Sequence, residues 1–213
     1  MNESTAAVGL RELRELVDAI VCDDGRLFSE LLERTPALGL ECFSEGATRQ
    51  GLDPATFFIP EIGHCIYSGD TALHFAAASY RPEMARKLIE AGADIRATNR
   101  RRAEPLHAAA KGDPGSARWN PAAQAETIVS LIAAGADPNA QNMDGATALH
   151  IAVRTRCAAA AGALLAHGAD PAIRNKSGST PMQLALHTTG RPGSGSPEAK
   201  AQQEDILRLL RGR

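Results

Sequence analysis

The sequence predicts an all-α fold, a solenoid of stacked helix-turn-helix repeats. Four segments align with one another, with steps of 33, 43 and 33 residues: GDTALHFAAA, RAEPLHAAAK, GATALHIAVR and GSTPMQLALH. Aromatic residues make up 4% of the chain and alanine supplies much of its apolar surface, which favours closely packed helices over a sheet sandwich. A fixed period with one insertion of ten residues is typical of repeats that bury their apolar faces against neighbouring copies.

Each repeat opens with residues suited to the start of a helix. Thr71, Thr147 and Thr180 can accept hydrogen bonds from the free N–H groups of a first turn. Pro105 and Pro181 stand at the first helical position, where a missing N–H costs nothing. A second apolar helix follows and ends at a glycine that enters the left-handed region readily. The apolar pairs are Leu88/Ile89, Leu131/Ile132, Leu164/Leu165 and Leu209/Leu210, and the glycines are Gly92, Gly135 and Gly168.

The shared pattern, T-x-L-H-x-A-A…L-L-x-x-G-A-D-x-N, closely resembles the ankyrin repeat and covers about residues 69–213. The resemblance implies an ankyrin-type α-solenoid, with antiparallel helix pairs joined by β-hairpin-like fingers and a concave face that binds other proteins. The chain departs from the pattern at Arg102 and Glu104, where Gly and Thr are expected, so this finger should be less ideal. Gln183 replaces the usual His of the fourth unit.

The chain divides into three expected parts. Residues 1–34 resemble a degenerate N-terminal capping repeat. Residues 35–68 form an insertion too apolar for a free loop, which we expect to pack on the array. Residues 69–213 contain four ankyrin-like repeats, with loop insertions near residues 113–123 and 188–200.

Charge and composition restrict the partners. A net charge of −2 gives no general attraction to nucleic acid or to an anionic membrane. The four cysteines are scattered without metal-ligand spacing, and no leader or membrane span is evident, so we expect a cytoplasmic monomer without metal or cofactor. His74, His107 and His150 fall at one repeat position, and we expect them to bridge neighbouring units rather than to converge on a metal.

An arginine-rich finger is the first candidate site. Arg100, Arg101 and Arg102 occupy the tip between the first two repeats, near Arg96. Guanidinium groups bind carboxylates and phosphates in a bidentate way, so the tip is a candidate contact for an acidic partner. The alternative is a solvated turn.

The two loop insertions are the second candidate. Pro114-Gly115-Ser116 matches Pro192-Gly193-Ser194, and the following helices match at the same offset of 78 residues, so both insertions should have the same length. We hypothesise that these loops bind a small anion with the arginines of the third unit, unless they are merely permissive. The hypothetical site comprises Ser116, Arg118, Arg154, Arg156, Arg191, Ser194 and Ser196.

Trp119, the single tryptophan, either pins its loop or anchors a partner. No nucleophile-base set and no Walker-type phosphate loop is recognisable. The sequence therefore predicts a non-catalytic scaffold that recognises a protein through the concave face and the arginine-rich finger. A sensor of a small anionic ligand is the alternative. The third interpretation is an enzyme whose pocket is built by the insertion, with His64, Tyr67 and Asp70 as candidates.

Overall fold

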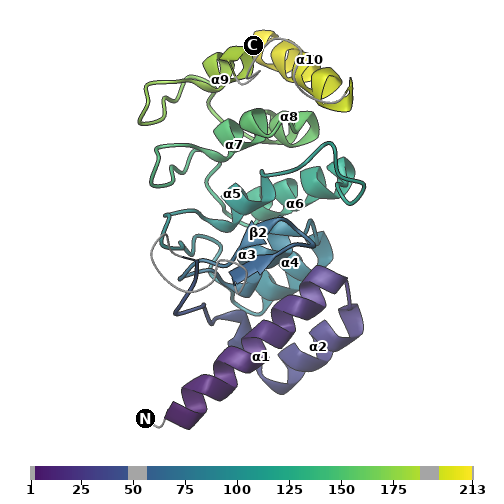
Figure 1. Ribbon diagram of the computed structural model, residues 1–213, viewed down its shortest axis with the longest axis vertical. Coiled ribbons are helices and arrows are strands. Elements are labelled where there is room, and N and C mark those ends of the chain that lie inside the picture. The colour runs from purple at the N-terminus through teal and green to yellow at the C-terminus, as the bar shows by residue number, and fades with distance from the viewer. Residues whose placement is uncertain (1–2, 48–56, 188–196, 213) are drawn as a thin grey trace.

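A computed structural model describes residues 3–47, 57–187 and 197–212, with side chains from residue 9 onward. Helix pairs stack in layers along the long axis, from the N-terminal pair at one end to the C-terminal pair at the other (Figure 1). The predicted all-α solenoid is confirmed. In the described ranges the elements are α1 (Glu3–Cys22), α2 (Gly25–Arg34), a 3-10 turn (Pro36–Gly39), β1 (Phe58–Ile59), β2 (His64–Cys65), α3 (Ala72–Ala78), α4 (Pro82–Glu90), α5 (Pro105–Ala109), α6 (Pro121–Ala133), α7 (Ala148–Arg154), α8 (Ala158–Ala166), α9 (Pro181–His187) and α10 (Pro197–Arg211).

The first helix of each of the first three repeats is fixed by a threonine or glutamate cap and a histidine. In the first repeat the Thr71 N–H donates to Nδ1 of His74 (3.1 Å), and Nε2 of His74 lies 3.0 Å from the carbonyl of Ala103 in the next repeat. A backbone N–H can only donate, so Nδ1 is the acceptor and the proton lies on Nε2. His107 and His150 make the same bridges, to Ala146 at 3.2 Å and Ser179 at 3.1 Å, which confirms the expected role.

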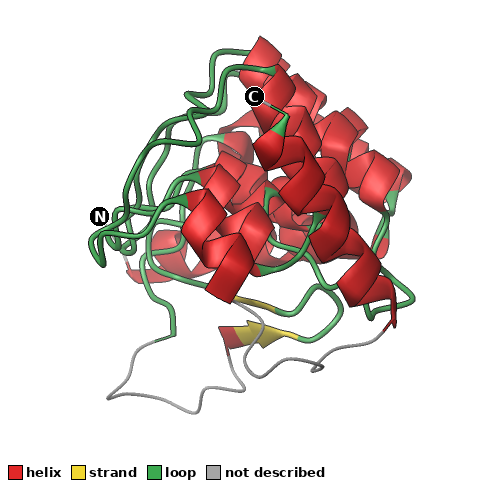
Figure 2. Ribbon diagram, turned by 90° about the horizontal axis from the view of Figure 1, so that it is seen from above, coloured by secondary structure: helices red, strands yellow, loops and turns green. Residues whose placement is uncertain are grey.

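The fingers between repeats are hydrogen-bonded turns that project to one side of the array (Figure 2). We name them the arginine finger (residues 94–104), the middle finger (137–147) and the last finger (170–180). An asparagine organises each, and in the arginine finger Oδ1 of Asn99 accepts from the N–H groups of Arg101 and Ala103. Asn142 and Asn175 repeat this geometry. The asparagine side chain thus accepts hydrogen bonds from backbone N–H groups of the turn, which have no neighbouring strand to bond with.

The second helices bury one side against their neighbours and end as predicted. Gly92, Gly135 and Gly168 follow them with φ of +94°, +108° and +92°, a region that glycine enters without steric cost. The buried stripe continues from repeat to repeat, through Met84, Ala85 and Leu88, Thr127, Ile128 and Leu131, Ala160, Ala161 and Leu164, and Ile206 and Leu210. The core is therefore continuous along the stack, as a one-dimensional array requires. No helix in the described ranges is long and apolar enough to span a membrane.

The N-terminal helices form a further pair below the first repeat. Asp24 caps α2 by accepting from the Leu27 N–H at 2.9 Å, and α1 lies against both α2 and α3. Asp23 between the two helices has φ of +61°, and Tyr80 and Arg156 take the same left-handed conformation between the helices of the first and third repeats. The pair therefore turns as a repeat does, although it lacks the T-x-L-H motif of the repeats.

Residues 40–47 and 57–71 run back along the first repeat. Phe43 exchanges backbone hydrogen bonds with the segment before α3, through Asp70 O at 2.9 Å and the Gly69 N–H at 2.8 Å. Gly46 is required in this pairing, because a Cβ there would lie 2.5 Å from the backbone nitrogen of Ser68. The hairpin of β1 and β2 completes the segment, with Phe58 opposite Cys65 and Ile59 opposite His64.

The two long connections do not have the same length, so that expectation is wrong. Nε2 of Gln124 donates to Ala109 O at the end of α5, and Nε2 of Gln203 donates to Ala185 O at the end of α9. These equivalent glutamines lie 79 residues apart, whereas the Pro-Gly-Ser motifs lie 78 apart. An offset of 78 pairs Leu209 with Leu131. Leu131 is fully buried in the core, whereas Leu209 is 38% exposed.

Candidate interaction surface

The arginine finger is tied to the middle finger by two of its four arginines. Arg101 pairs with Asp144 at 3.1 Å and Arg96 with Asp137 at 3.8 Å, both between exposed side chains. The Met143 N–H also donates to Arg101 O at 2.8 Å, and Lys176 of the last finger bonds to Asp144 in the same way. Exposed ion pairs contribute little to stability, so these contacts chiefly fix the spacing of the fingers.

Arg100 and Arg102 are exposed, and their guanidinium groups make no hydrogen bond or ion pair with the described residues. The Arg100 guanidinium carbon lies 5.5 Å from the centre of the Tyr67 ring, within cation–π range, and that of Arg101 lies at 5.9 Å. Arg102 has φ of +53°, where its counterparts Gly69 and Gly145 are glycines. The finger thus keeps two available guanidinium groups, one of them on a strained backbone.

Glu104 is the second departure from the repeat pattern. It stands in the cap position of α5, is 8% exposed, and its Oε2 has no hydrogen-bond partner among the described residues. Burial raises the pKa of this carboxyl above its ordinary value, although the charge of Arg96 opposes the shift. Threonine at this position in the other units carries no such buried charge.

The inserted segment covers the face of α3 that carries Phe75. The Phe75 ring is fully buried, with the Phe43 ring 5.6 Å away at 73° and the His64 ring 5.6 Å away at 82°. Figure 1 shows β2 lying over α3. The inner helices α5 and α7 are also buried, α5 throughout and α7 up to Val153, so the exposed side chains on this side of the second and third repeats are mainly those of the fingers.

His64, Tyr67 and Asp70 come together, but around a buried carboxylate. Asp70 is fully buried and accepts from the Tyr67 N–H (2.7 Å) and from Asn99 Nδ2 (2.8 Å), while His64 Nε2 lies 3.6 Å away. Burial alone would raise the pKa of Asp70, but its interactions with His64 and His74 hold it below the ordinary value. None of the three candidate residues lines either cavity described below. The cluster joins the inserted segment to the arginine finger.

The loop before α6 is ordered by its tryptophan. Trp119 is partly buried, and its indole N–H donates to Oε1 of Gln124 at 2.8 Å. Ser116 Oγ accepts from the Arg118 N–H at 3.2 Å, and the Arg118 side chain is exposed. The pinning role of Trp119 is confirmed by this bond.

The other members of the hypothetical anion site are only partly placed. Arg154 ends α7 with an exposed side chain, and Arg156 follows in the turn to α8. Neither lines a cavity described here, whereas Ser116 and Arg118 share one. Arg191, Ser194 and Ser196 lie outside the described residues.

That cavity, which we call the hairpin–loop cavity, has a volume of about 850 Å³. Four segments line it: the end of α1, the hairpin turn at residues 60–63, the α3–α4 turn at residues 78–81, and the loop at residues 111–120. Sequence reasoning missed the contributions of Ser79, Arg81 and Lys111. Periodicity places Ser79 and Lys111 just after a first helix and Arg81 just before a second helix, but only the course of the insertion shows that they face one space.

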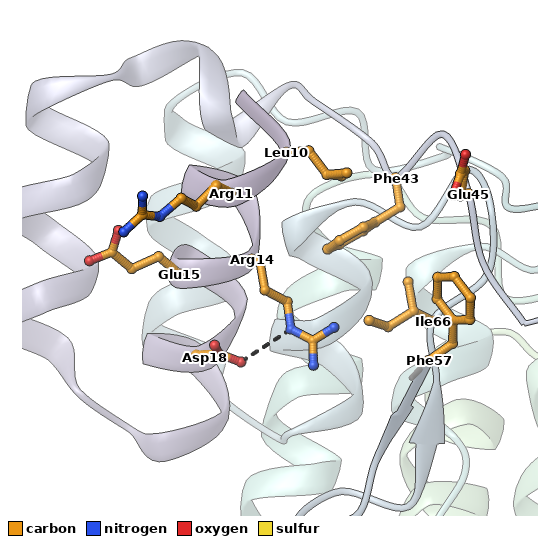
Figure 3. A pocket seen from close by; sticks show the side chains of 9 residues that line it. All are labelled: Leu10, Arg11, Arg14, Glu15, Asp18, Phe43, Glu45, Phe57 and Ile66. Atoms are coloured by element: carbon orange, nitrogen blue, oxygen red, sulfur yellow. Dashed lines mark ion pairs between the residues drawn. The ribbon is translucent and has the colours of Figure 1, made fainter. Parts of the chain in front are cut away.

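A second hollow of about 600 Å³ lies between α1 and the inserted segment (Figure 3). Phe43, Phe57 and Ile66 form its apolar floor, and charged side chains of α1 stand around it. Arg14 and Asp18 on this rim pair with each other at 3.5 Å.

Comparison with known families agrees with this architecture. A family model described as ankyrin repeat matches residues 68–100, and one described as ankyrin repeats (many copies) matches residues 131–185. No curated protein matches the chain. Repeats of this family are generally protein-interaction modules and typically non-catalytic. The chain therefore contains ankyrin repeats, which the family models match over residues 68–100 and 131–185.

Proposed function

We propose that this protein binds an acidic surface of a partner protein through the fingers of the repeat array. Arg100 and Arg102 supply the main charged contacts. The observation that carries the proposal is that these two guanidinium groups are exposed and unpaired within the described ranges, while Arg96 and Arg101 hold the neighbouring finger.

The arginine finger contains two features that destabilise the fold, and this supports the same assignment. Arg102 occupies a left-handed position held by glycine in the neighbouring units, and Glu104 buries an unpartnered carboxylate oxygen where those units use threonine. Each feature costs on the order of 1 kcal/mol or more. Strain of this kind clusters at functional positions, because selection for stability alone would remove it.

The covered face of the first repeat limits where the partner can lie. The inserted segment occupies the face of α3 around Phe75, and it also supplies Tyr67 beneath Arg100. We infer that the partner contacts the fingers, and that the insertion presents Arg100 rather than binding the partner itself. The cation–π contact holds the Arg100 guanidinium group beside the inserted segment.

Affinity capture with matched variants tests the proposal. The wild-type chain should retain a stoichiometric partner that Arg100→Glu/Arg102→Glu loses. The control is Arg11→Glu/Arg26→Glu, an identical change of charge at exposed positions of the N-terminal helix pair. Retention of the partner by the finger variant, or equal loss in both variants, would contradict the assigned surface.

A further inference from the structure

The hairpin–loop cavity is separate from the fingers and has its own chemistry. Its four segments come from the N-terminal helix pair, the insertion, the first repeat and the second repeat. A volume of about 850 Å³ lies within the range of pockets that hold small molecules. Tyr80 and Lys111 hold two of the segments together, because the Tyr80 hydroxyl donates to Lys111 O at 2.5 Å.

One wall of the cavity is apolar. Pro60, Ile62, Tyr80 and Trp119 line it, and Ile62 and Trp119 also pack against the core. Trp119 cannot turn freely, because Gln124 accepts its N–H and Gly112 lies beside the indole. The wall is therefore a fixed surface against which an apolar body of a ligand can lie.

Hydrogen-bond donors with unused capacity line the cavity as well. Lys111 Nζ donates to Gly63 O at 2.6 Å, which leaves two of its three N–H groups, and the Arg118 side chain has no partner among the described residues. Arg81 also lines the cavity, but Asp23 at 3.1 Å and the carbonyls of Ile20 and Val21 use its guanidinium group.

Ser79 also lines the cavity and is 8% exposed. Its Oγ has no hydrogen-bond partner among the described residues, but this atom is enclosed and offers no hydrogen bond to a group in the cavity.

The cavity also presents carboxylates, which changes the ligand that fits. Glu61 and Asp113 line it, and neither forms an ion pair with the described residues. One oxygen of Asp113 accepts from the Gly115 N–H at 3.1 Å, so its position is fixed. Two available cations therefore face two available carboxylates, and a simple anion, as the sequence suggested, would meet repulsion as well as attraction.

We propose that the hairpin–loop cavity binds a small zwitterion, a molecule with one carboxylate and one ammonium group on an apolar or aromatic body. The carboxylate binds Lys111 and Arg118. The ammonium group binds Asp113 and Glu61, and the apolar body lies against Trp119. A free amino acid with an aromatic side chain is the simplest molecule of this class.

Trp119 makes the test direct, because it is the single tryptophan of the chain and lines the cavity. Its emission is followed while the full-length protein is titrated with three related probes. L-phenylalanine carries both charges, 3-phenylpropanoate only the carboxylate and 2-phenylethylamine only the ammonium group. We expect saturable binding of L-phenylalanine, with each singly charged probe about tenfold weaker or more.

Variants separate the two halves of the site. Arg118→Gln should weaken binding of L-phenylalanine about tenfold, and so should Asp113→Asn, which keeps the oxygen that accepts from Gly115. Arg154→Gln, outside the cavity, should bind as the wild type does.

Three results would overturn the assignment. One is the absence of any saturable emission change with L-phenylalanine, and another is equal affinity for all three probes. The third is equal weakening by Arg154→Gln and Arg118→Gln, which would place the binding outside the cavity. The finger variants leave these residues unchanged, so this test stands or falls independently of partner binding.

Discussion

Trp119 donates its indole N–H to Oε1 of Gln124, 2.8 Å away, and this bond ties the long loop to the first turn of α6. Gln124 is fully buried, and its Nε2 also donates to Ala109 O and Lys111 O. One side chain therefore satisfies three groups at the centre of the second repeat.

Replacing Gln124 with Leu should destabilise the fold by about 2–4 kcal/mol, because several polar groups would be left buried and unpaired. Urea unfolding followed by circular dichroism measures the loss. Gln203→Leu is the matched control, since Gln203 donates only to Ala185 O among the described residues and should cost about 1 kcal/mol. Equal losses in the two variants would refute the central role of Gln124.

Stability should fall as the pH is lowered toward 5, in part because of His107. Burial lowers the pKa of His107 from 6.5 to about 4. The unfolded chain therefore takes up a proton between pH 6.5 and 4 while the folded chain does not, so acid favours unfolding. Between pH 7 and 5, His107 should lower the free energy of unfolding by about 2 kcal/mol.

His107→Gln should remove that share of the pH dependence. The fourth repeat shows that glutamine can cap the helix, since Gln183 Oε1 accepts from the Thr180 N–H at 2.9 Å. The variant should be less stable at pH 7, because the bridge to Ala146 O is weakened, and should lose less stability on going to pH 5. If the free energy of unfolding of the variant, measured by urea titration, fell between pH 7 and 5 as much as that of the wild type, His107 would not be the origin of the pH dependence.

Arg102→Gly should stabilise the protein by up to about 1 kcal/mol, because it relieves the left-handed strain while adding some freedom to the unfolded chain. Thermal unfolding reports the gain, and partner capture should decline in the same variant. The reverse change at the equivalent position, Gly145→Ala, should destabilise, since a Cβ there would lie 2.8 Å from the backbone nitrogen of Lys176. A lower melting temperature for Arg102→Gly would show that the arginine stabilises its finger.

Glu104→Thr should also stabilise the protein, by about 1 kcal/mol at pH 7, because it removes a buried carboxylate oxygen without a partner. The raised pKa means that folded Glu104 binds a proton more readily than unfolded Glu104, so its penalty grows as the pH rises through that range. The gain should therefore shrink below the ordinary carboxyl pKa. A gain independent of pH in denaturant titrations would contradict this explanation.

The repeated part of the fold was predictable from the sequence because its signals are local and occur several times. Caps such as Thr71, closing glycines such as Gly92 and the bridging histidines each depend on residues at most one repeat away. The pinning of Trp119 was also among the stated alternatives. Each of these features needs only the period and the chemistry of one helix end.

The cavity and the unequal loops could not be predicted in the same way. Ser79 and Lys111 face one cavity only because the insertion crosses α3, and no periodic pattern specifies where an insertion runs. The sequence alignment of the two long connections is wrong by one residue because Leu209 and Leu210 are adjacent. Either leucine could belong to the core by its chemistry, but only Leu210 is buried. Such features depend on tertiary packing, which overrides a match of sequence letters.

The surface assigned to the partner depends most on Arg100 and Arg102. Once a captured partner is purified, isothermal titration of it into the wild-type chain and into Arg100→Glu/Arg102→Glu measures that dependence directly. The account predicts at least tenfold weaker binding for the variant, and a wild-type affinity that falls as salt is raised from roughly 50 to 200 mM. Affinity of the variant within twofold of the wild type, with Arg11→Glu/Arg26→Glu weakened instead, would contradict it.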